Sequence, residues 1–259
     1  AVEVERAAFR PLMSGFHAFF SIGGFAGAAV ITVLLSANLD PLATTLVAAL
    51  PMAVAMVVAS PRLLRASPPE GAPLIAAPHG IVLLLAASAA VMFLVEGAIL
   101  DWSALLVTEK GLVREARGGL GYSIFAIAMT AGRLGGDFVT ARVGDRATLF
   151  WGGLTTMAGF GLLLAAPIPA LAMSGFLLIG LGASNIVPVL FRGAGAQRAM
   201  PAGLAVAAIT TAGYSGILVG PAGIGFVAGM AGLPVAFWLL ALLVGVVVLS
   251  ARAVTAQQR

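Results

Sequence analysis

Long apolar runs separated by short polar stretches make up most of this chain. A helix needs about 20 mostly apolar residues to cross the roughly 30 Å hydrocarbon core of a bilayer. Eight runs meet that length, and they cover residues 11–36, 41–60, 80–100, 119–141, 148–166, 169–191, 203–229 and 232–250. The ten-residue alternating segments of membrane β-barrels are absent from the sequence. The pattern therefore predicts an all-α polytopic membrane protein with eight transmembrane helices.

The composition points to lipid as the solvent of this chain. Hydrophobic residues make up 61% of the sequence and charged residues only 9%, whereas soluble domains carry about 25% charged residues. The 33 glycines suit membrane helices, whose backbones approach closely where side chains are small. Cysteine is absent, which excludes disulfides, thiolate metal sites and cysteine nucleophiles. We expect a lipid bilayer around the chain, and neither a metal nor a cofactor.

The basic residues set the orientation, because Lys and Arg favour cytoplasmic loops. With the N-terminus in the cytoplasm, only Lys110, Arg114 and Arg117 lie on the outer side. The cytoplasmic side then holds Arg6, Arg10, Arg62, Arg65, Arg133, Arg142, Arg146, Arg192, Arg198, Arg252 and Arg259. Both termini are therefore expected in the cytoplasm. The arginines are dispersed and build no basic face, so we expect no nucleic-acid partner.

The first ten residues, AVEVERAAFR, lack the basic start, short apolar core and cleavage site of a signal peptide. They are interpreted as a loop within a longer protein. A second polar break, residues 60–73, contains four prolines and predicts a linker rather than a helix. We place a central cytoplasmic linker at 61–79, between a segment 1–60 with two spans and a segment 80–259 with six.

A charged, glycine-rich stretch, GRLGGDFVTARVGDR, occupies residues 132–146. It holds five of the 24 charged residues of the chain, and the pattern predicts a short cytoplasmic hairpin between two spans. A weak internal repeat also appears. SIGGFAG at 21–27 and YSGILVGP at 214–221 both place glycines four apart in spans that are six apart, which fits two repeated six-helix units.

Taken together, these segments resemble the major facilitator superfamily of secondary transporters over the whole chain. Residues 132–146 are similar to the family's cytoplasmic loop signature between the eighth and ninth spans, although Asp137 and Arg142 are spaced more widely than usual. Residues 10–24, 95–103 and 180–191 are similar to the bacterial YbjJ-type branch, which is related to fucose-permease-like proteins. Family members have twelve spans, and this chain resembles spans five to twelve. The resemblance implies that 1–60 ends the N-terminal six-helix bundle, that 80–259 forms the C-terminal one, and that the first four helices are lacking.

The resemblance also implies a gating contact. Asp137 would face the start of the first span, where a carboxylate favours a helix N-terminus. Pro11 would take the first helical position, and Arg10 would pair with Asp137. The other residues of this loop motif are Gly132, Arg133, Arg142, Gly144 and Arg146. The alternative is a solvated cluster of loop charges.

Two titratable residues fall inside predicted spans. Glu96 is a candidate proton carrier, because an acid within a bilayer is protonated, paired or exposed to water. The alternative places it near an outer interface marked by Asp101 and Trp102. His17 titrates near neutral pH and is a second candidate for proton coupling. Its alternative is a hydrogen-bonded packing residue among phenylalanines.

Polar residues in two later spans are candidate solute contacts. Asn185 precedes Pro188 by three residues, and a proline bends a helix and frees a backbone carbonyl. An amide at such a bend can bind a polar solute, or it can simply hydrogen-bond a neighbouring helix. Tyr214 and Thr210 are further candidates, with the threonine hydroxyl bonded to its own backbone as the alternative.

The function that follows is a secondary active transporter of a small solute, with proton coupling as a hypothesis. The alternative is a truncated non-transporting membrane protein or an interaction scaffold. An enzyme is not expected. The GYSG segment matches the serine motif of rhomboid-type proteases, but that serine needs a histidine base on a later helix, and both histidines precede it.

Overall fold

The computed structural model describes residues 1–63 and 77–256, and these residues form helices and connections without strands. Most of the predicted linker lies outside the described residues, as do Arg65 and Arg259; before it, Ser60–Arg62 forms the short 3-10 helix η1. The predicted spans are helices α2 (Met13–Ser36), α3 (Pro41–Ala59), α4 (Ile81–Glu109), α5 (Leu120–Val143), α6 (Asp145–Ala165), α7 (Pro169–Ala183) continued by α8 (Ile186–Ala196), α9 (Ala202–Ala231) and α10 (Leu233–Thr255). The all-α polytopic fold is confirmed.

Seven helical segments in the described part of the chain are long and apolar enough to cross a membrane, with α7 and α8 counted as one. The eighth predicted span is α5, which is also helical but is not among the seven. Its 24 residues suffice to cross, but Arg133, Asp137 and Arg142 lower its apolar character. α5 therefore falls outside the seven because of its lower apolar character and not because of its length.

The predicted hairpin at residues 132–146 is wrong. α5 continues to Val143 and α6 begins at Asp145, so Gly144 alone separates them, with a φ of 84° that suits glycine. The other glycines of this stretch lie inside α5. In a bilayer a continuous helix satisfies every backbone group internally. Gly132 and Gly136 serve close packing within that helix, while Gly144 forms the turn to α6.

Two further boundaries differ from the sequence interpretation. The first residues form a helix, α1 (Val2–Ala8), rather than a loop. α4 extends to Glu109, so Asp101 and Trp102 lie within it and do not mark its end. Another short 3-10 helix, η2 (Glu115–Arg117), precedes α5.

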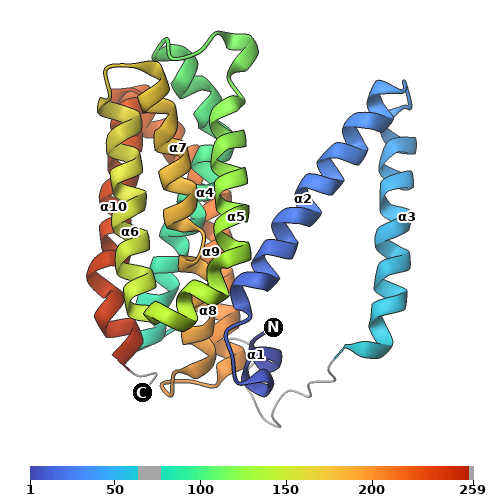
Figure 1. The fold of residues 1–259 in the computed structure, drawn as a ribbon, viewed down its shortest axis with the longest axis vertical. Helices are drawn as coiled ribbons and strands as arrows, with labels where there is room; N and C mark the ends of the chain where they lie inside the picture. The colour runs from blue at the N-terminus through green and yellow to red at the C-terminus, as the bar shows by residue number, and fades with distance from the viewer. Residues whose placement is uncertain (64–76, 257–259) are drawn as a thin grey trace. The chain divides into compact units, whose positions relative to one another are not determined.

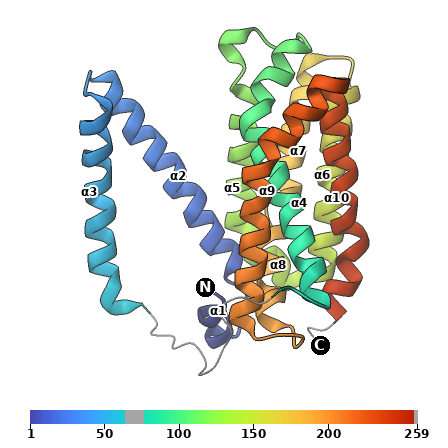
Figure 2. The same cartoon turned by 180° about the vertical axis from the view of Figure 1, so that it is seen from behind.

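The chain divides into two compact units, Ala1–Ala18 with Ala76–Arg259 in one and Phe19–Ile75 in the other. In the first unit α4, α5, α6, α7, α9 and α10 lie side by side in a helical bundle (Figure 1). α4 packs most extensively on α9, while α6 packs on α7 and α10, and α5 on α7. In the view from behind, α9, α4 and α10 form the face of the bundle nearest the viewer (Figure 2). The core is mainly aliphatic, and its largest fully buried side chains are Phe160, Phe176 and Phe237.

Glycines allow α6 and α7 to pack backbone against backbone. A β-carbon added at Gly159 would lie 2.8 Å from the carbonyl oxygen of Gly175. One added at Gly152 would lie 2.7 Å from the carbonyl oxygen of Gly182. This is the close approach that small residues permit between membrane helices.

The second unit contains the rest of α2 and α3. Asp40 caps α3, because its Oδ1 accepts hydrogen bonds from the amides of Leu42 and Ala43 at 3.0 and 3.1 Å. Pro41 follows as the first helical residue, a position where its missing amide hydrogen costs nothing.

Candidate functional site

Asp137 of α5 binds the start of α2. Its Oδ1 accepts a hydrogen bond from the Ser14 amide at 3.0 Å, and its Oδ2 accepts one from the Gly15 amide at 2.8 Å. The first amides of a helix have no partners within the helix, and the helix dipole favours negative charge there. α2 begins at Met13, so Pro11 does not take the predicted first helical position.

Glu5 of α1 completes the cap of α2. Its Oε2 accepts hydrogen bonds from the amides of Leu12 and Met13, both at 2.7 Å. Four successive amides at the start of this helix are therefore bound by two carboxylates from two other helices. This second carboxylate is absent from the sequence prediction.

Arg192, near the end of α8, joins the acids of this cluster. Its Nε donates to Glu5 at 2.5 Å and its Nη1 to Asp145 at 2.6 Å, and its Nη2 lies 3.8 Å from Oδ1 of Asp137. The predicted pair between Arg10 and Asp137 is not present in the described structure. Arg192 takes that place because α8 brings its guanidinium among the acids, whereas the Arg10 side chain is exposed.

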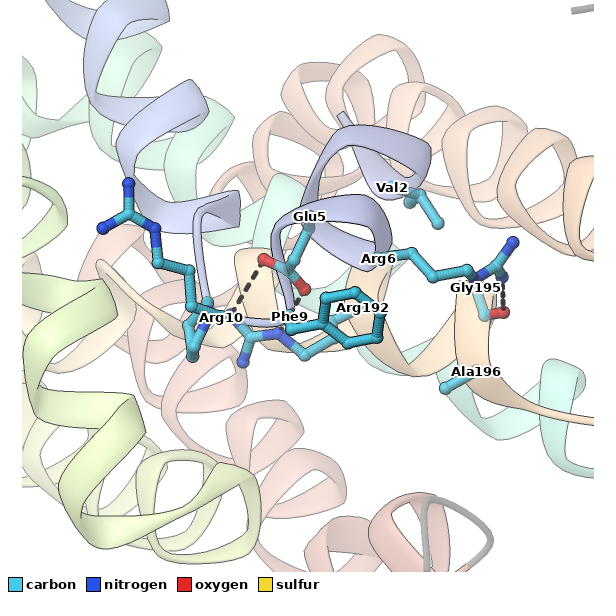
Figure 3. A pocket seen from close by; sticks show the side chains of 9 residues that line it. Val2, Glu5, Arg6, Phe9, Arg10, Arg192, Gly195 and Ala196 are labelled. Atoms are coloured by element: carbon cyan, nitrogen blue, oxygen red, sulfur yellow. Dashed lines mark hydrogen bonds and ion pairs between the residues drawn. The ribbon is translucent and has the colours of Figure 1, made fainter.

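α1 is held against α8 by two side chains (Figure 3). Glu5 binds Arg192, and Arg6 donates from Nη2 to the carbonyl oxygen of Gly195 at 2.7 Å. Burial raises the pKa of the Glu5 carboxyl, but hydrogen bonds from Arg192 and from the α2 amides outweigh it, so the pKa lies below its usual value. The carboxyl is therefore ionised at neutral pH.

Arg133 lies inside the bundle and not in a loop, which corrects its assignment to the cytoplasmic charges. Its side chain is 5% exposed, and its Nη2 donates to Oε1 of Glu96 at 3.0 Å. Its Nε donates to the carbonyl oxygen of Ser184 at 3.4 Å. A buried charge in a membrane needs such partners.

Glu96 lies near the middle of α4, about 20 Å from either end at 1.5 Å per residue. The alternative position at an outer interface therefore does not fit. Its pairing with Arg133 joins α4 to α5 at this depth.

His17 of α2 belongs to the same compact unit as Glu96 and Arg133. Its Nδ1 is 2.9 Å from the carbonyl oxygen of Met13, and its ring packs against Phe191 at 5.7 Å between centroids, which matches the alternative of a hydrogen-bonded packing residue.

Asn185 lies at the break between α7 and α8. Its Nδ2 donates to the carbonyl oxygen of Gly132 at 3.1 Å and to Oγ of Ser184 at 2.9 Å. Its Oδ1 is buried and has no hydrogen-bond partner among the described residues. The interhelical hydrogen bond predicted as one alternative is therefore present, while one amide oxygen stays unsatisfied.

The remaining candidate residues contact neither the cap of α2 nor the pair of Glu96 and Arg133 in the interactions described below. Thr210 donates to the carbonyl oxygen of Val206, which is the backbone alternative. Tyr214 is half exposed and its ring contacts Phe93 at 5.7 Å. Arg142 lies over the ring of Phe138 at 3.9 Å, and Arg146 is exposed. Among the described residues no group of three or more His, Cys, Asp or Glu could hold a metal ion.

No known family model matches the chain. An uncharacterized MFS-type transporter of Yersinia pestis is 46% identical over 256 residues, which are 98% of this chain and 67% of the relative. An uncharacterized transporter, y4wD, of Sinorhizobium fredii is 29% identical over 95% of this chain and 66% of its own length. The membrane protein MosC of Rhizobium meliloti is 38% identical over 59% of this chain and 37% of its own length.

These relatives agree with a multi-pass membrane protein built from apolar helices. The chain spans about two thirds of the first two relatives and just over a third of the third. The match to the Yersinia protein extends over nearly all of this chain. The chain belongs to the major facilitator superfamily (MFS).

Proposed function

We propose that the chain forms eight spans of a twelve-helix secondary active transporter, in the YbjJ-type branch, that moves a small solute across the bacterial inner membrane by alternating access. Residues 1–60 would close the N-terminal bundle, and 80–259 would form the C-terminal one. The coverage of 67% of the Yersinia relative supports eight spans out of twelve. The connection between α4 and α5 carries Lys110, Arg114 and Arg117. It lies at the bundle end opposite to the α5–α6 connection, the α8–α9 connection and the end of α10 (Figure 1). Those three places carry Arg142, Arg146, Arg198 and Arg252, and this larger basic count supports cytoplasmic termini.

The observation that carries this proposal is the ion pair of Glu96 and Arg133 beside the broken helix α7–α8. Charged residues at this depth in a membrane are costly and mark ion or solute pathways. Discontinuous helices near the midplane form the binding sites of many secondary transporters. Asn185, with its unsatisfied amide oxygen at the break, is the proposed solute contact.

Proton coupling would act through Glu96. Its carboxylate is paired with Arg133, and protonation would remove the negative charge that holds the guanidinium. His17 lies within electrostatic range of both residues. A proton on Glu96 would therefore weaken the link between α4 and α5 during the transport cycle.

The gate would be the cap of α2. Asp137 and Glu5 hold four amides at the start of that helix, and Arg192 holds both acids. Releasing these contacts would free the start of α2 from α5 and α8. Forming and breaking them would thus bias the protein between a closed and an open cytoplasmic side.

The experiment uses intact protein purified from its native membrane and reconstituted in proteoliposomes that contain a pH-sensitive dye. Small sugars, organic acids, amino acids and amphipathic amines are added outside, and both solute uptake and solute-driven proton entry are recorded. We expect one solute class to drive proton entry, and Glu96→Gln to abolish it. Glu109→Gln, at the exposed end of the same helix, is the matched control and keeps the signal. Solute uptake by Glu96→Gln with an unchanged pH dependence would contradict the proton coupling, and a lack of uptake for every class would contradict transport.

A further inference from the structure

The break between α7 and α8 leaves one backbone carbonyl without its helical partner. In a regular helix the amide of residue 188 would donate to the carbonyl oxygen of Ser184, but Pro188 has no amide hydrogen. Ser184 is fully buried, so water does not reach it. A buried carbonyl without a donor costs free energy comparable to a lost hydrogen bond.

The donor for this carbonyl comes from another helix. Nε of Arg133 donates to the Ser184 oxygen at 3.4 Å, while Nη2 of the same guanidinium donates to Glu96 at 3.0 Å. The two contacts use two different nitrogens of one rigid, planar group, and this fixes their relative directions. Glu96 therefore orients the guanidinium that reaches the break.

The neighbouring residue of α5 holds the other side of the break. Gly132 accepts a hydrogen bond from Nδ2 of Asn185 at 3.1 Å. A β-carbon at Gly132 would lie 2.7 Å from Cβ of Ser184, so only glycine lets α5 come this close. Two successive residues of α5 thus bind two successive residues of the break.

We propose that Arg133 is a positioning residue that replaces the amide hydrogen missing at Pro188 and so holds Asn185 in place at the bend. Glu96 keeps Arg133 in the required orientation. This inference deepens the proposed function and rests on it only where Asn185 is taken as a solute contact. The hydrogen-bond replacement itself can be tested without any solute.

The test is a cycle of four proteins that leaves no unpaired charge. The native pair Glu96 and Arg133 is compared with the neutral double variant Glu96→Gln/Arg133→Met, each with Pro188 and with Pro188→Ala. Alanine at 188 supplies the amide that Ser184 lacks, so Arg133 becomes dispensable for that carbonyl. Amide hydrogen–deuterium exchange of peptides covering residues 183–192 is measured in lipid nanodiscs at pH 7.

We expect the neutral double variant to speed exchange in these peptides by about fivefold when Pro188 is present, because about one hydrogen bond is lost. With Pro188→Ala the increase should fall below about twofold. Pro221→Ala is the matched control: this proline also lies inside a helix, α9, and should give no rescue. An equal increase in both backgrounds, no increase in either, or equal rescue by Pro221→Ala would overturn the inference.

The outcome is separable from that of the transport assay. If exchange follows the expected cycle and no solute is transported, the positioning role stands and the proposed function fails. If transport is found and the cycle is additive, the proposed function stands and the role of Arg133 is refuted.

Discussion

Gly136 of α5 lies so close to Asn185 at the α7–α8 break that no β-carbon fits between them. A β-carbon built at Gly136 would overlap Oδ1 of Asn185 and would lie 2.5 Å from its Cγ and 2.8 Å from Cβ of Ser14. Three segments therefore meet at one glycine. A β-carbon built at the adjacent Gly135 would have no neighbouring atom within 4 Å. Gly135 therefore serves as a control for substitutions at Gly136.

Gly136→Ala is expected to destabilise the protein by about 1–3 kcal/mol, because overpacking forces side chains or backbone to shift. Gly135→Ala should be neutral or slightly stabilising, since alanine favours the helix more than glycine does. Melting temperatures of the two variants in the same detergent decide the matter. Equal melting temperatures would contradict the close contact.

The pair of Glu96 and Arg133 predicts a strongly non-additive cycle. Each single change, Glu96→Gln or Arg133→Met, leaves one buried polar group without its partner and should cost about 3–5 kcal/mol. The double variant should cost clearly less than the sum of the two. The free energy of unfolding is measured by titration with a denaturing detergent. Additive costs would show that the two side chains do not interact.

The cap on α2 predicts acid sensitivity. The pKa of Glu5 lies below its usual value of 4.5, since the hydrogen bonds from Arg192 and from the amides of Leu12 and Met13 outweigh the effect of burial. The unfolded chain then binds more protons, so this contribution to stability is complete above about pH 4.5 and is lost as the pH falls through the lowered pKa. Stability should therefore drop in that acidic window.

Glu5→Gln should flatten this part of the stability curve, measured as melting temperature between pH 7 and pH 3. Glu3→Gln is the control on the same helix, because Glu3 is exposed and pairs only locally with Arg6. A curve for Glu5→Gln as steep as that of the unchanged protein would place the acid response elsewhere.

The spans could be predicted from the sequence because apolar run length is a local property. The runs at 41–60 and 203–229 match α3 and α9 within two residues at each end. Residues 132–146 were misassigned because charge and glycine normally indicate a connection. In α5 the same residue types instead serve buried pairing and close packing, and these depend on neighbours that the local sequence does not show.

The site was less predictable for the same reason. Arg133 and Glu96 are 37 residues apart, and Glu5 and Arg192 are 187 apart, so a single sequence carries no sign of either pair. The proline at 188 did indicate a freed carbonyl and a bend. It could not indicate that an arginine from α5 would supply the donor.

The contact between Asp137 and the start of α2 is the central claim, and a single-cysteine reporter tests it most directly. Ser14 is fully buried and its hydroxyl has no partner among the described residues, so Ser14→Cys is a mild change in a chain without cysteine. Labelling by a membrane-impermeant maleimide is measured in inside-out vesicles. Asp40→Asn, which also weakens a two-amide helix cap, is the matched control.

We expect Asp137→Asn to raise the labelling rate of Ser14→Cys by about tenfold, because a charge-assisted contact worth about 1.5 kcal/mol is lost, while Asp40→Asn leaves the rate unchanged. An unchanged rate in Asp137→Asn, or an equal increase in both variants, would contradict a gate at this contact.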